Sequence, residues 1–261
     1  MTTGDINAKG ITIKSSRELD LMREAGRIIA EAKLAVKNAL APGVTSLEMD
    51  ALAEEIIKKR GAIPSFKGYQ PAPHMPPFPA LICFSFNEEI VHGIPSERKM
   101  REGDIVSVDF GAIVEGYHGD SAFTAGVGSI SDTAQRLIDV TSDSLDAGIK
   151  MALIGSRLTD ISNSIQIYAE SKGYSVVKEY VGHGIGRELH EEPQIPNYGS
   201  PGRGPLLREG MVLAIEPMLN VGSWKTKVMP DGWTIVTIDG ELSAHSEHTV
   251  AITSDGPEVL T

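Results

Sequence analysis

The chain has 261 residues, with 35 acidic and 24 basic side chains and a formal net charge of −11. This balance argues against a general nucleic-acid binder, which would present a basic face, so we expect no direct nucleic-acid specificity. The single cysteine excludes an intramolecular disulfide, and no apolar run reaches the roughly 18 residues of a membrane span, so we expect a cytoplasmic protein without a membrane segment.

The first part of the chain predicts two helices and then an irregular segment. After a short polar lead over residues 1–15, apolar side chains fall on one face of Ser16–Leu40, and Ser16 can cap this helix. A second amphipathic helix is predicted over Ser46–Lys59, where a glycine stops it. Six prolines between residues 64 and 79 exclude regular structure there, and His74 among them is expected on the surface.

The rest of the chain alternates strand-like runs with a second pair of helices. These helices are predicted over Thr133–Met151 and Leu158–Lys172. The strand-like runs are Leu81–Phe86, Ile105–Phe110, Tyr174–Val181, Val212–Ile215, Thr234–Ile238 and Thr249–Thr253. Strands with helices in each half predict an α+β fold, in which the helices cover one side of a curved, mostly antiparallel sheet.

One ordered series of motifs occurs twice along the chain. Each copy has two glycines eighteen positions apart, a His-Gly-Ile triplet, an Arg-Glu-Gly triplet, an acid eight positions after that arginine, and a histidine two positions before a second acid. The first copy ends at Asp120 and the second at Glu247. Because internal repeats dictate architecture, we expect a single domain over 16–261 whose halves, approximately 16–130 and 131–261, face each other across a site.

Four acids occupy matching positions in the two copies and adjoin apolar strand sequence: Asp109, Asp120, Glu216 and Glu247. A lone acid at a strand end is usually a solvated cap, but a repeated set beside apolar runs predicts burial. Buried carboxylates must be paired, protonated or bound to metal, and no lysine or arginine lies immediately beside these four in the sequence. Their four negative charges balance two divalent cations, and a neutral His183 completes five ligands. Oxygen-rich ligation with one imidazole suits Mn, Fe, Co or Zn.

Two further histidines are candidates for chemistry rather than for metal binding. His92 is the repeat counterpart of His183, and His190 follows His183 in a glycine-rich turn. His118 and His245 each lie two positions before an acid, on the same strand face as that acid. They are either hydrogen-bond partners of the ligands or packing residues.

Taken together, these motifs resemble the type I methionine aminopeptidases, metallopeptidases of the pita-bread (creatinase/aminopeptidase) fold. The resemblance covers about residue 14 to the C-terminus and is carried by Asn87-Glu88, Val91–Pro95, Gly103–Val106, Asp109–Gly111, Gly119–Ser121, Gly182–Gly186, Leu189–Pro193, Ile215–Met218, Asp231–Thr234 and Ser243–Thr249. It implies that the domain is catalytic and removes the initiator methionine when the second residue is small, with water activated by two metals as the nucleophile.

The resemblance also implies a role for each ligand. Asp109 would bind one metal, and Asp120 and Glu247 would bridge the two. His183 and Glu216 would complete the second metal. Glu216 would in addition carry a proton from the attacking water to the leaving amine, as a general acid and base.

Substrate contacts follow from the same resemblance. His190 would hydrogen-bond the scissile carbonyl oxygen and stabilise the charge that develops there. His92 would contact the peptide nitrogen beyond the first residue. The pocket for the methionine side chain would draw on Ile63, Phe66, Tyr69, Cys83, Leu189 and Trp233, for which plain core packing is the alternative.

Three departures from the family pattern bear on these expectations. Leu189 stands where members often have an aromatic residue, which leaves a softer pocket wall. Gln70–Phe78 looks inserted, and it predicts either a semi-rigid rim over the methionine pocket or a surface excursion. The third departure is the lack of a Cys/His-rich N-terminal extension and of a long insert between His183 and Glu216, which argues against the type II enzymes.

Two other functions stay open on the sequence. An aminopeptidase P or prolidase would usually carry an extra N-terminal domain. A catalytically inactive binding module on the same fold has no reason to retain five ligands and both histidines. We expect nascent polypeptide N-termini as partners, with the ribosome as a further candidate, and a monomer.

Overall fold

The computed structural model describes residues 10–73 and 75–261, and the predicted lead up to residue 9 and His74 lie outside these described residues. Four α-helices and fifteen strands make up the described part, and each strand pairing in it is antiparallel. Within the same residues, none of the helices combines the length and apolar character needed to traverse a lipid bilayer.

Helices α1 (Ser16–Ala39) and α2 (Ser46–Lys59) both begin at capping boxes. The side chains of Ser15 and Thr45 accept from the backbone N–H three residues on, and the glutamate at that position accepts from the backbone N–H of the cap residue. Such caps satisfy free N–H groups of the first turn and contribute about 1 kcal/mol each. Both predicted helices are confirmed, but Ser15 rather than the predicted Ser16 caps α1.

Helices α3 (Asp132–Ile149) and α4 (Leu158–Ser171) agree with the prediction to within two residues at each end. Leu34 was expected among the apolar residues on the buried face of α1, and that expectation is wrong, because Leu34 is 61% exposed. Leu34 lies two positions from the fully buried Val36, and at 3.6 residues per turn it points to the opposite side of the helix.

The first half of the sheet structure is built on one long hairpin. Strands β4 (Ile105–Val114) and β5 (Tyr117–Gly126) pair along their whole length, so that Asp109 faces Ala122 and Gly111 faces Asp120. Two shorter strands flank β4, namely β1 (Ile63–Pro64) and β2 (Ile82–Phe86). Strand β5 was not predicted, because its many small and polar residues give it no alternating apolar pattern.

The second half holds a five-stranded group in the order β15-β14-β9-β7-β8. Its members are β7 (Gly182–Gly184), β8 (Glu191–Ile195), β9 (Val212–Ile215), β14 (His248–Thr253) and β15 (Gly256–Val259). Two three-stranded groups complete the described sheets: β6 (Ser175–Val176), β10 (Met218–Asn220) and β13 (Ser243–His245), and β3 (Glu89–Val91), β11 (Thr226–Val228) and β12 (Ile235–Thr237).

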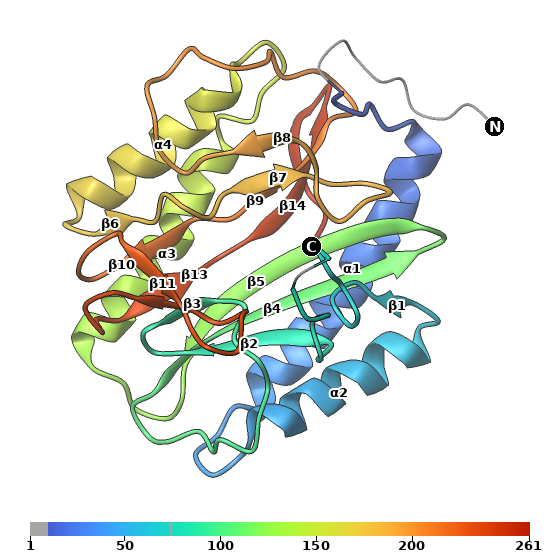
Figure 1. Cartoon of the computed structure of the whole chain (residues 1–261). Helices are drawn as coiled ribbons and strands as arrows, with labels where there is room; N and C mark the ends of the chain where they lie inside the picture. Colours follow the sequence, from blue (N-terminus) through green and yellow to red (C-terminus); the bar gives the residue numbers. More distant parts are fainter. Residues whose placement is uncertain (1–9, 74) are drawn as a thin grey trace.

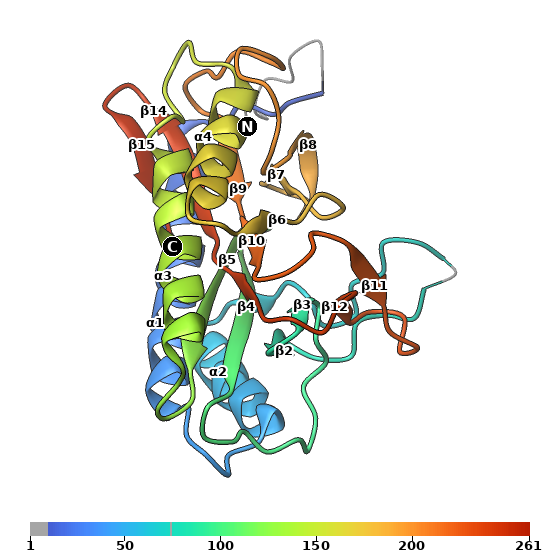
Figure 2. The same ribbon diagram turned by 90° about the vertical axis from the view of Figure 1, so that its left-hand side faces the viewer.

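Helices and exposed hairpins lie on opposite sides of the strands. Figure 1 shows α1 and α2 beside the β4–β5 hairpin, and α3 and α4 beside the strands of the second half. In Figure 2, turned by 90°, the helices stand on one side and the β11–β12 hairpin projects on the other. The predicted α+β, pita-bread arrangement is confirmed, although its strands form four hydrogen-bonded groups rather than one continuous sheet.

Candidate active site

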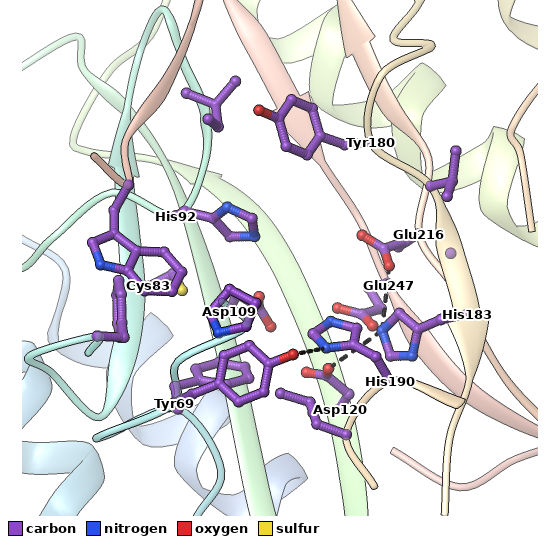
Figure 3. A pocket seen from close by; sticks show the side chains of 18 of the residues that line it. Tyr69, Cys83, His92, Asp109, Asp120, Tyr180, His183, His190, Glu216 and Glu247 are labelled. Carbon is purple, nitrogen blue, oxygen red and sulfur yellow. Dashed lines mark hydrogen bonds and ion pairs between the residues drawn. The ribbon is translucent and has the colours of Figure 1, made fainter. Parts of the chain in front are cut away.

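Five strands or strand ends bring the candidate ligands to one place between the halves. Asp109 lies on β4, Asp120 on β5 and His183 on β7, whereas Glu216 directly follows β9 and Glu247 lies in the turn between β13 and β14. In Figure 3 their side chains converge on one cavity. The Oγ1 of Thr249 on β14 accepts from Asp120 N at 3.0 Å and donates to Asp120 O at 2.8 Å, which ties the two halves together at the site.

The ligating atoms lie close enough to share metal. His183 Nε2 is 3.8 Å from Asp120 Oδ2 and 3.5 Å from Glu216 Oε1. Asp120, His183 and Glu247 each offer one ligand atom, and these three atoms all lie within 4.8 Å of one another. Asp109 and Glu216 line the same cavity, so the structure brings all five sequence-predicted ligands together.

Unpartnered oxygens show that these residues fit a cation. Asp109 Oδ1, Asp120 Oδ1 and Glu247 Oε1 are buried and have no hydrogen-bond partner. A buried carboxylate without a partner is costly unless a proton or a metal compensates its charge. Four carboxylates and one imidazole suit a divalent first-row metal, so the residues of this site fit a divalent cation.

The carboxylates are electrostatically strained without a cation. Burial raises the pKa of Asp109 to about 6. Burial, and then repulsion from neighbouring acids, raises the pKa values of Asp120, Glu216 and Glu247 well above their usual range. Bound cations would relieve this repulsion and restore the charged forms.

A basic residue does lie near the acids, although none adjoins them in the sequence. Lys33 of α1 reaches Ser121, to whose Oγ its Nζ donates, and Ser121 Oγ in turn donates to Glu247 O at 2.7 Å. Burial lowers the pKa of Lys33 to about 8, against the attraction of Glu247, Asp109 and Asp120. The fold thus brings a lysine near the acids from a distant part of the sequence.

His183 is prepared as a neutral ligand. Its Nδ1 lies 2.9 Å from Gly184 O, and because a carbonyl only accepts, Nδ1 carries the proton and Nε2 offers its lone pair toward the acids. Burial lowers the pKa of His183 to about 3, which keeps the ring uncharged at neutral pH.

His190 lies beside the ligands and is held by a second side chain. Its ring centroid is 4.3 Å from that of His183, and its Nδ1 is 2.6 Å from the Tyr69 hydroxyl. When that hydroxyl donates to Nδ1, the Nε2 of His190 carries a proton that it can donate to a substrate. Burial lowers the pKa of His190, which favours this neutral form.

His92 stands on the other side of the cavity in a strained backbone conformation. Its φ is 59°, in the left-handed region that non-glycine residues rarely adopt. The ring packs edge-on against Tyr180 at 5.9 Å and Trp233 at 6.1 Å, and burial lowers its pKa to about 4. A neutral imidazole held this firmly is suited to a directed hydrogen bond.

The cavity has a volume of about 750 Å³ and an apolar wall. Five of the six predicted pocket residues line it: Phe66, Tyr69, Cys83, Leu189 and Trp233. Ile63 does not join them, because it lies on the short strand β1 with its side chain 63% exposed, and placing it in the pocket was wrong. Phe78, from the inserted segment, is buried against Trp233, with ring centroids 5.1 Å apart.

The two remaining histidines have different surroundings. His245 Nε2 is buried 3.7 Å from Glu216 Oε2 and 4.0 Å from Glu247 Oε2 and has no hydrogen-bond partner, so it lies beside the ligands without a hydrogen bond to them. His118 Nδ1 is instead 3.0 Å from Ser65 Oγ, outside the ligand cluster.

Several residues that line the cavity were not predicted from the sequence, Tyr180 and Val228 among them. Tyr180 lines the cavity beside His92, and it lies three residues before the ligand His183. That proximity to a ligand was the only sequence signal that could have found it, because the contact with His92 joins the two halves of the chain.

Sequence comparison places the chain among known proteins. The model of "Metallopeptidase family M24" matches residues 20–254. A curated relative from Clostridium acetobutylicum, described as "Methionine aminopeptidase", is 56% identical over 252 residues, which are 96% of this chain and 98% of the relative.

Structural comparison agrees with this assignment. A crystal structure of methionine aminopeptidase from Thermotoga maritima superposes with a TM-score of 0.93 at 48% identity, covering 96% of this chain and 99% of that one. A prolidase from Pyrococcus furiosus reaches a TM-score of 0.77 at 24% identity, and this chain covers 65% of it. That second likeness shows the shared fold alone.

Proposed function

This chain belongs to metallopeptidase family M24, and on that premise we propose that it removes the N-terminal methionine from nascent proteins and peptides when the second residue is small. The chain is a metallo-aminopeptidase. The observation that carries the proposal is the convergence of four carboxylates and His183 at one end of an apolar cavity, with three carboxylate oxygens left unpartnered.

Two divalent ions, drawn from Co, Mn, Fe or Zn, fit the charge and donor types of this set. Asp109 would hold one ion, Asp120 and Glu247 would bridge both, and His183 and Glu216 would hold the other. Ions bound in this way supply Lewis acidity and a nucleophilic water at neutral pH. Glu216 would in addition take up a proton from the attacking water and pass it to the leaving amine.

The histidines serve the substrate. With Tyr69 at its Nδ1, His190 Nε2 can donate to the scissile carbonyl oxygen, where negative charge develops in the transition state. His92, across the cavity, can bond the backbone of the second residue. The wall of Phe66, Cys83, Leu189 and Trp233 excludes water and offers an unbranched apolar side chain a matching surface.

Methionine release from short peptides tests the proposal. Protein loaded with Mn or Co should cleave Met-Gly and Met-Ala peptides much faster than Met-Leu or Met-Lys peptides, and a chelator should abolish turnover until metal is returned. Equal rates across the panel, or faster cleavage of Ala-Pro peptides, would contradict the proposed specificity. A nascent chain on the ribosome, a monomeric state and a cytoplasmic location stay predictions.

A further inference from the structure

Residues 69–73 and 75–78, here called the proline loop, close on themselves at the edge of the cavity. Phe78 N donates to Tyr69 O at 2.9 Å, and inside the loop Gln70 Nε2 donates to Met75 O at 2.6 Å. The loop also contains Pro71, Pro73, Pro76 and Pro77. Proline restricts the backbone of the unfolded chain, so ordering this loop costs less conformational entropy. These hydrogen bonds and prolines therefore give the loop a defined conformation.

The proline loop is fastened to a segment far away in the sequence. Trp233 Nε1 donates to Pro76 O at 3.0 Å, and the Trp233 ring meets Phe78 edge-on. Trp233 lies in the turn of the β11–β12 hairpin, where Asp231 Oδ1 accepts from its backbone N at 2.8 Å. In Figure 2 the loop and the hairpin project side by side from the face opposite the helices. They form one wall at the mouth of the cavity.

Some apolar side chains of this wall line the cavity but are not fully buried. Pro71 and Val228 line the cavity, yet both are exposed, Val228 to 51%. Met75 lines it as well and is only partly buried. Exposed apolar groups gathered at the mouth of a cleft mark a surface that a ligand can cover. The deeper wall of Phe66, Cys83 and Leu189 is already buried.

The size of the cavity leaves room beyond the first residue of a peptide. Its volume of about 750 Å³ far exceeds one methionine side chain. Each further residue of an extended peptide adds roughly 3.3–3.6 Å of length, so the third and fourth residues would leave the ligand end and pass the mouth. Met75, Pro71 and Val228 line this part of the cavity and are exposed or only partly buried.

We infer that Met75, Pro71 and Val228 form an outer subsite that binds an apolar side chain at the third or fourth position of the substrate peptide. This inference rests on the proposed function. Covering these side chains removes apolar surface from water on both partners. Partial burial of one leucine side chain at the subsite should lower KM on the order of tenfold.

Two tetrapeptides that share their cleaved bond test the subsite. Metal-loaded wild-type protein should show a KM for Met-Ala-Leu-Leu on the order of tenfold below that for Met-Ala-Ser-Ser, with similar kcat. The variants Met75→Ser and Val228→Ser should each reduce this difference, and the double variant should remove it. Thermal unfolding of each variant shows that it is folded.

Matched controls separate the subsite from general effects of substitution. Pro73→Ala changes the same loop at a residue outside the cavity lining, and Val259→Ser changes a comparably exposed valine, 44% exposed on β15. Both controls should keep the wild-type preference for the leucine peptide. A preference that survives in the Met75→Ser/Val228→Ser double variant would overturn the assignment to these residues.

The Met-Ala-Ser tripeptide distinguishes the two possible failures. Equal KM values for the tetrapeptides, with normal methionine release from Met-Ala-Ser, would overturn the outer subsite and leave the proposed function standing. Release of no methionine from any of the three peptides would overturn the proposed function itself.

Discussion

The two His-Gly-Ile triplets hold matching places in the repeat but have different surroundings. His183 lies on β7 with its Nε2 3.5 Å from Glu216 Oε1, inside the ligand cluster. His92 has a φ of 59° and packs against Tyr180 and Trp233 across the cavity. The repeat therefore duplicates a position at the site without duplicating its chemistry, because carboxylates surround His183 and aromatic rings surround His92.

The second histidine pair shows the same divergence. His245 approaches Glu216 Oε2 at 3.7 Å, whereas its counterpart His118 turns to Ser65 Oγ at 3.0 Å. In both pairs the copy from the second half lies nearer the metal ligands. Four predictions test how far this division extends.

The largest effect is expected on metal affinity, when His183 and His92 are each replaced by alanine in separate variants. His183→Ala removes the only imidazole among the five proposed metal ligands. Replacing a residue that merely hydrogen-bonds a ligand typically lowers metal affinity 10–100-fold, so loss of the ligand itself should lower it by at least roughly 100-fold. His92→Ala should retain its metal and lose turnover instead. Titration of both variants with Mn checks this, and equal metal affinity in the two variants would contradict the division of roles.

A large loss of turnover is expected from His190→Ala. Removing one hydrogen bond to the developing oxyanion should lower kcat on the order of 10²–10³-fold. The metal content should stay at the wild-type value, because His190 lies beside His183 without belonging to the ligand set. Steady-state kinetics and elemental analysis on the same preparation check the prediction, and loss of metal would show that His190 is a ligand.

A pH effect of intermediate size is expected from His92. Its folded pKa of about 4 lies below the usual value of 6.5, so the neutral ring contributes stability that is fully present above about pH 6.5 and is lost as the pH falls toward 4. The loss should reach up to about 1.4 kcal/mol per pH unit.

Comparison of wild type with His92→Gln isolates this contribution, because titration of the carboxylates is common to both proteins. In the presence of a chelator, urea unfolding between pH 6.5 and 5 should show a shallower loss of stability in the variant. Parallel curves for the two proteins would show that His92 does not titrate with a lowered pKa.

The smallest effect on metal binding is expected from substitution of Lys33. This lysine of α1 lies near Glu247, which belongs to the second half of the chain. Its positive charge repels divalent ions, so Lys33→Met should tighten Mn binding several-fold and enlarge the rise in melting temperature on adding Mn. The matched control is Lys37→Met, one turn along the same helix and exposed. Weaker binding in Lys33→Met would mean that Lys33 acts as a tether through Ser121 and not through its charge.

Local patterns in the sequence were sufficient for the helices and for the identity of the ligands. The apolar period and the glycine that follows it placed α2 over Ser46–Lys59 without error, because a helix is stabilised by contacts within a few residues. The repeat pointed to the four acids and His183, because they hold matching places in one ordered series of motifs that occurs twice. The cavity lining agrees with that set.

Only the tertiary structure decided which side chains surround those ligands. Ile63 was assigned to the pocket together with Phe66 from the family resemblance, yet the chain after β1 sends the two side chains to different environments, with Phe66 7% and Ile63 63% exposed. Lys33, Tyr180 and the contact between Pro76 and Trp233 join segments that no local pattern relates. These contacts depend on antiparallel pairing and helix packing between distant segments, and sequence patterns that span a few residues carry no information about them.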